Sequence, residues 1–72
     1  MISATIMDKD MRELIRAPIR SHNPVIIRRK VRELMREYPA ADWIELFYHD
    51  DTRLVSCQID RLFERSEQLL LR

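Results

Sequence analysis

The side chains with the clearest chemical potential are arginines in the middle of the 72-residue chain. Four of them fall within nine positions: Arg28, Arg29, Arg32 and Arg36. If this segment is a helix, a repeat of 3.6 residues places Arg28, Arg32 and Arg36 on one stripe, with Arg29 beside it. Guanidinium groups bind phosphate and carboxylate oxygens, so the stripe predicts contact with nucleic acid or with an acidic protein. The alternative is a solvated helix face, with a positive charge that nearby glutamates partly offset.

Charge is distributed unevenly along the sequence, although the formal net charge is only +1. Residues 1–36 contain nine Lys/Arg and four Asp/Glu, which gives +5, whereas residues 37–72 contain four and eight, which gives −4. Such an asymmetry bears on electrostatic partners rather than on fold. The basic half could bind nucleic acid or the acidic half of another chain.

Residues suited to catalysis or metal binding are few. His22, His49 and Cys57 do not form a metal-ligand spacing, and no third group orients a Cys-His pair. We therefore expect no enzymatic activity, no cofactor and no metal site. One cysteine excludes an intramolecular disulfide and suits a reducing compartment, and the longest apolar runs are three residues. The expected location is cytoplasmic, without a membrane span.

The elements that must position these residues are predicted to be helices. The clearest start is Asn23-Pro24, an N-cap residue followed by proline at the first helical position. Apolar spacing and the prolines that end helices predict one all-α domain over residues 1–72. Its four helices are expected at about 8–17, 24–38, 42–49 and 53–70. Glycine is absent, which argues against a hairpin-rich β domain. Without glycine, Asn23 and residues 49–51 are the candidates for a left-handed backbone conformation.

The last two expected helices, joined by residues 49–52, would form a helix-turn-helix. Residues 52–65 resemble the recognition helix of winged-helix and related bacterial regulators, within a similarity that covers residues 42–71. This resemblance implies that Ser56, Gln58 and Arg61 contact DNA, with Gln58 suited to adenine and Arg61 to guanine.

The hypothesis from sequence is a small DNA-binding regulator of transcription, of the size of bacterial and phage accessory proteins. Its rival is a protein-interaction module, such as a phage-type inhibitor or adaptor, that binds an acidic protein through the arginine-rich helix. The near-zero net charge and the acidic second half favour the rival. A helical hairpin packed for stability alone is the third interpretation.

An apolar surplus near the end of the chain suggests self-association. The last expected helix carries more apolar surface than so small a core needs, at Phe63, Leu69 and Leu70. We therefore expect a homodimer through this helix. The alternative is that these residues belong to an ordinary core.

Overall fold

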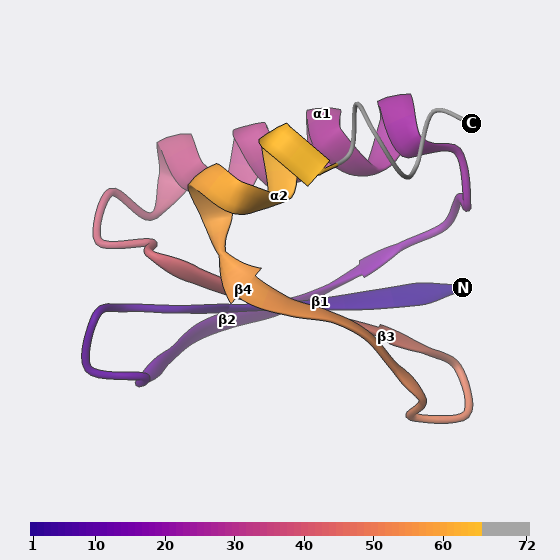
Figure 1. The fold of residues 1–72 in the computed structure, drawn as a ribbon, viewed down its shortest axis with the longest axis horizontal. Coiled ribbons are helices and arrows are strands. Elements are labelled where there is room, and N and C mark those ends of the chain that lie inside the picture. Colours follow the sequence, from indigo (N-terminus) through magenta and orange to yellow (C-terminus); the bar gives the residue numbers. More distant parts are fainter. Residues whose placement is uncertain (66–72) are drawn as a thin grey trace.

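The chain folds into an antiparallel sheet with two helices on one of its faces (Figure 1). The computed structural model describes residues 1–65, and the side chains of residues 1–63. In chain order the elements are β1 (Ile2–Met7), β2 (Glu13–Ile19), α1 (Pro24–Glu37), β3 (Trp43–Tyr48), β4 (Arg53–Gln58) and α2 (Ile59–Arg65). The strand order across the sheet is β2-β1-β3-β4, and each neighbouring pair is antiparallel. The expected all-α class is therefore wrong, because the domain is α+β.

Three of the four expected helices are wrong. The segment 8–17 forms a turn and most of β2, and the segment 42–49 contains β3. The segment 53–70 begins with β4 and turns helical only at α2. Strands therefore lie on both sides of the turn at 49–52, so the expected helix-turn-helix does not exist. The helix expected at 24–38 is confirmed as α1.

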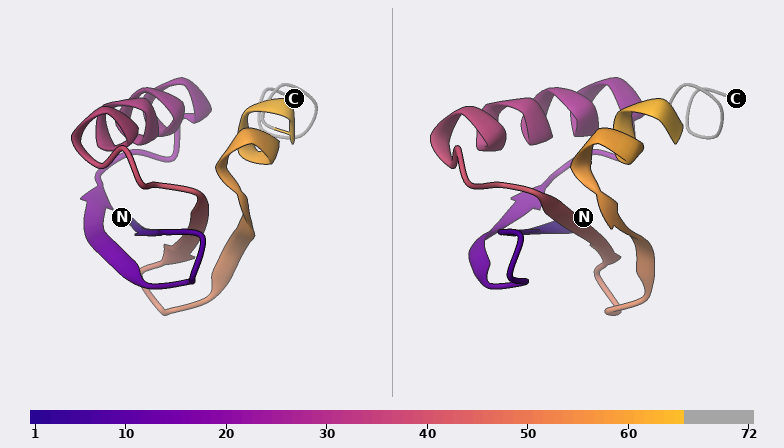
Figure 2. Two further views of the ribbon diagram at one scale, coloured as in Figure 1. Left: turned by 90° about the vertical axis from the view of Figure 1, so that its left-hand side faces the viewer. Right: turned by 60° about the vertical axis from the view of Figure 1, so that its left-hand side comes forward.

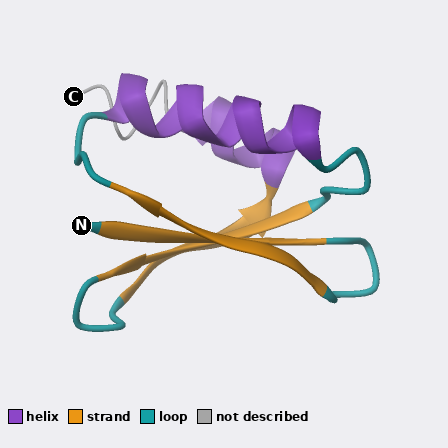
Figure 3. Ribbon diagram, turned by 180° about the vertical axis from the view of Figure 1, so that it is seen from behind, coloured by secondary structure: helices purple, strands orange, loops and turns teal. Residues whose placement is uncertain are grey.

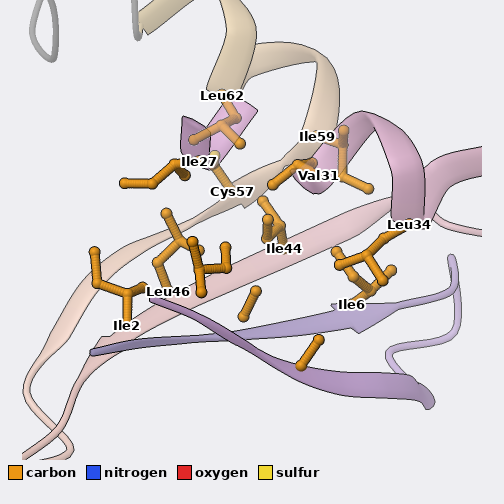
Figure 4. Close-up of a cluster of buried hydrophobic side chains, with 13 residues drawn as sticks. Ile2, Ile6, Ile27, Val31, Leu34, Ile44, Leu46, Cys57, Ile59 and Leu62 are labelled. Carbon is orange, nitrogen blue, oxygen red and sulfur yellow. The ribbon is translucent and has the colours of Figure 1, made fainter. Parts of the chain in front are cut away.

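The strands alternate their side chains between a covered face and an open face of the sheet. Ile2, Ala4 and Ile6 of β1 and Ile44 and Leu46 of β3 are buried beneath the helices (Figure 4). A period of two residues is the pattern of a strand. Apolar residues also occupy the open face, and this second set produced the helix-like spacings seen in the sequence. Its members include Met7, Trp43 and Phe47.

The start of α1 is fixed by local chemistry. The side-chain oxygen of Asn23 accepts a hydrogen bond of 2.9 Å from the backbone N–H of Val25, and Pro24 is the first helical residue. This cap satisfies one of the N–H groups that a helix leaves without a partner. Asn23 has an extended backbone (φ −70°), so its expected left-handed conformation is wrong.

α1 supplies the apolar stripe that closes the core. Ile27, Val31 and Leu34 recur at helical spacing and are at most 4% exposed. Ile59 and Leu62 of α2 join them on the same face of the sheet (Figure 4). The left view of Figure 2 shows β2 and β4 rising at the two sides, with both helices across the opening. One face of the sheet is thus covered by helices, and no described element covers the other.

Two hairpins turn without glycine, each through a residue with positive φ. In the β1–β2 turn, Met11 has φ 63°, and the Asp8 carboxylate accepts hydrogen bonds from the backbone N–H groups of Asp10 and Arg12. Aspartate often closes turns in this way. Methionine rarely adopts a positive φ, because its Cβ crowds the backbone.

The β3–β4 turn uses aspartates throughout. Asp51 has φ 66°, as the sequence suggested for residues 49–51. The Asp50 carboxylate accepts a hydrogen bond of 3.0 Å from the backbone N–H of Thr52. Hydrogen bonding from Thr52, through its side chain and its backbone, lowers the pKa of the Asp50 carboxyl. The charged form of Asp50 therefore supports this turn, and acidification through its lowered pKa weakens that support.

Replacing Met11 with glycine tests the strained turn. Met11→Gly removes a left-handed cost of about 1–2 kcal/mol. Among the described residues only Met11 and Asp51 have positive φ. Lys9→Gly in the same turn therefore relieves no strain and is the matched control. We expect Met11→Gly to be more stable than Lys9→Gly by at least about 1 kcal/mol in urea unfolding. Equal stabilities would contradict the left-handed turn.

Candidate nucleic-acid interface

The arginine stripe expected from sequence is present on α1. Arg29, Arg32 and Arg36 are exposed, and Arg28 is half-buried. The stripe points away from the sheet because Ile27 and its apolar neighbours face the core. The Nε of Arg28 is buried and has no hydrogen-bond partner among the described residues. Four guanidinium groups therefore share one helix, three of them open to solvent.

α2 holds one of these arginines in place. The guanidinium carbon of Arg32 lies 4.9 Å from the centroid of the Phe63 ring. A cation over an aromatic face is attracted by the negative charge density of the ring, and at exposed sites the attraction is worth about 0.5–1 kcal/mol. Phe63 is half-buried and also packs against the core. It thus connects the two helices and orients Arg32 without neutralising its charge.

The arginines of α1 lack carboxylate partners among residues 1–63. Three ion pairs occur there, and α1 contributes to only one of them, between Lys30 and Glu33 at 3.9 Å. The other two join Arg16 to Glu13 and Arg53 to Glu45. None involves the four arginines of the stripe. Their positive charge is therefore available to an external anion.

Two hairpin turns that contain aspartates lie on the far side of the molecule from this stripe. Asp8 and Asp10 belong to the β1–β2 turn, and Asp50 and Asp51 to the β3–β4 turn. Figure 3 shows both hairpin turns extending from the sheet on the side away from the helices. Lys9 and Arg12 cancel the two aspartates of the β1–β2 turn, so only the β3–β4 turn is net acidic on the side opposite the basic helix. Such a field orients the molecule as it approaches an anionic partner.

The other expected contact residues lie elsewhere. Ser56 and Gln58 are on β4, and they alternate with the buried Cys57, so they face the open side of the sheet. Arg61 is exposed on the first turn of α2. These residues are brought together, but not with the arginines of α1. Their expected role in a recognition helix is wrong, because two of them are strand residues.

A shallow hollow that the sequence did not predict joins these three residues to Trp43. It has a volume of about 300 Å³ and is lined by Trp43, Ser56, Cys57, Gln58 and Arg61. The indole N–H of Trp43 donates a hydrogen bond of 3.1 Å to the hydroxyl of Ser56. Pairing of β3 with β4 makes this contact, and a helical interpretation of both segments conceals it. Alternation along β4 places Ser56 and Gln58 on one face, but their position beside Trp43 depends on the register between β3 and β4.

The remaining expectations from sequence can be placed only in part. Phe63 contacts Arg32, whereas Leu69 and Leu70 lie outside the described residues. Within the described part of the chain, no group of three or more His, Cys, Asp or Glu side chains could hold a metal ion. Among the helices of residues 1–65, none has the length and apolar character needed to cross a membrane.

No family model, curated protein or solved structure matches this chain.

A double-mutant cycle tests the contact between the helices. Arg32→Ala and Phe63→Leu should couple by about 0.5–1 kcal/mol in urea unfolding, because each substitution removes the same cation–ring contact. Arg29→Ala with Phe63→Leu is the control and should be additive, since no contact between Arg29 and the ring is present in the structure. Additive behaviour of the Arg32 pair would show that the ring does not hold this guanidinium.

Proposed function

We propose that this protein binds duplex DNA through the arginine stripe of α1 and acts as a small regulator of transcription. The observation that carries the proposal is the stripe itself. Three exposed guanidinium groups and a half-buried fourth share one helix, without a carboxylate partner among residues 1–63. Charge of this kind, presented on one convex element, is the electrostatic footprint of a nucleic-acid-binding surface.

The shape of α1 suits a groove of DNA. Its 14 residues span about 21 Å at 1.5 Å per residue. The major groove is about 12 Å wide and admits a helix. A helix that lies along or beside the groove brings arginines to phosphates, and arginine is matched to phosphate by its paired donors. The acidic β3–β4 turn would then lie away from the DNA, which limits repulsion.

Phosphate contacts give affinity and position rather than sequence preference. The residues expected to contact bases, Ser56 and Gln58, lie on the opposite face of the sheet from α1. We therefore propose no base contact for them. Binding should depend strongly on salt and weakly on sequence.

An acidic protein is the second candidate partner for the same helix face. The observation in its favour is the net charge of +1, which gives little long-range attraction to DNA as a whole. In that case the stripe would bind carboxylates, and duplex DNA would not compete for it.

Binding to a random duplex at two salt concentrations tests the proposal. Four phosphate contacts predict a fall in affinity of roughly 100-fold between 50 and 200 mM salt, because each contact displaces condensed cations. Replacing Arg29, Arg32 and Arg36 together with glutamine should weaken binding by at least about tenfold at low salt and flatten the salt dependence. Fluorescence anisotropy of a labelled duplex measures both.

The matched control has the same change in net charge. Glutamine at Arg12, Arg16 and Arg53 removes three arginines from the strands and from the β1–β2 turn, and it should affect binding far less. Equal losses in the two triple variants would indicate only a response to net charge. No binding to duplex at low salt would overturn the proposal and favour the acidic protein.

A further inference from the structure

Exposed apolar side chains gather at one end of the molecule. Six large apolar residues are exposed among those described, and five of them lie where β1, β4 and α1 begin and β3 ends. These five are Met1 (58% exposed), Val25 (47%), Ile26 (41%), Leu54 (39%) and Tyr48 (36%). Ile2 pairs with both Ile19 and Tyr48, which fixes these strand ends side by side. The sixth, Met11, lies in the β1–β2 turn at the opposite end (Figure 1).

This apolar end also contains a hollow that reaches the core. The hollow has a volume of about 210 Å³, and Ile2, Ile27, Leu46, Leu54 and Val55 supply its apolar lining. His22 and Tyr48 form its rim, with ring centroids 5.6 Å apart. Core residues such as Ile2 and Ile27 thus contribute to a cavity that opens at the surface. Covering this apolar surface is favourable, because each Å² of apolar area removed from water contributes about 25 cal/mol.

We propose that this apolar end is a self-association surface, at which two copies of the chain pair about a two-fold axis. The surface comprises the hollow, with Tyr48 and Leu54 in its lining, and Met1 next to Ile2. Val25 and Ile26 lie at the same end of the molecule but on other sides of α1. Each copy would place Leu54 and Tyr48 against the hollow of the other. An isologous pair of this kind needs a surface that is complementary to itself.

Charge at the border of the surface favours a second copy. Asp50 and Asp51 lie next to Tyr48 on the sheet side, and Arg20 lies in the connection that leads to α1 on the helix side. The first turn of α1 contains no acidic residue. A two-fold axis that inverts the second copy therefore sets the acidic turn of each chain opposite Arg20 of its partner.

The size of the surface determines how strong the dimer is expected to be. Stable interfaces bury about 800 Å² per partner. The end of this molecule has a cross-section of only 26 × 18 Å, perpendicular to its 31 Å axis. The dimer should therefore be weak and dissociate on dilution, with a dissociation constant on the order of 10–100 µM.

Analytical ultracentrifugation over roughly 1 µM to 1 mM protein tests the proposal. The wild-type chain should change from monomer to dimer within this range. Leu54→Glu should raise the dissociation constant by at least about tenfold, because it buries an unpaired charge. Met11→Glu is the matched control, an exposed apolar residue at the other end, and should dimerise like the wild type. A wild-type chain that stays monomeric throughout, or equal effects of the two variants, would overturn the proposal.

A second variant keeps the test independent of folding defects. Asp50→Asn retains an oxygen that can accept the hydrogen bond from Thr52 but removes the charge. It should weaken the dimer by roughly two- to fivefold, the usual value of an exposed ion pair. Unchanged or tighter association of this variant would show that Asp50 does not face Arg20 of the partner. Mass is the readout, so the outcome does not depend on whether the protein binds DNA.

Discussion

The packing of α1 against the sheet is the contact on which the rest of the structure depends. Ile27, Val31 and Leu34 fill the space above β1 and β3, and Val31 is completely buried. Truncation of one such side chain typically costs about 2–5 kcal/mol. A small domain has a total stability of about 5–15 kcal/mol, so this stripe accounts for a large part of it. The sheet has no other long helix among the described residues, and α1 must keep one orientation.

That orientation decides which side chains meet solvent. With its apolar stripe directed to the sheet, α1 presents Arg29, Arg32 and Arg36 outward, and Phe63 of α2 holds Arg32 from the side. The β3–β4 hairpin meanwhile carries Asp50 and Asp51 to the other side of the molecule (Figure 3). The packing of α1 against the sheet therefore also determines where the positive charge lies. The helix that completes the core is also the element with the most available positive charge.

The sequence predicted the helix α1 and the position of the arginine stripe along it, because both depend on local signals. Asn23-Pro24 defines the start of the helix, and helical spacing separates its apolar and basic sides. The strands were missed because Trp43, Ile44 and Phe47 fit a helical spacing, although they lie on two faces of a strand. The absence of glycine pointed the same way, yet Met11 and Asp51 make the turns with positive φ.

Some signals for the sheet were present in the sequence. Ile2, Ala4 and Ile6 alternate, and a strand rich in aromatic and branched residues follows at Trp43. The grouping of Ser56, Gln58 and Arg61 around Trp43 could not be foreseen, because it depends on the register between β3 and β4. Long-range pairing of this kind has no counterpart in local spacing.

The most direct test of this account is an NMR titration of the labelled protein with a random DNA duplex. Backbone assignment would first establish the four strands and α1. The account predicts that amide shifts on adding duplex concentrate at residues 28–36, while the turns at 8–11 and 49–52 remain unperturbed. Shifts confined to the open face of the sheet, or no shifts at low salt, would contradict it.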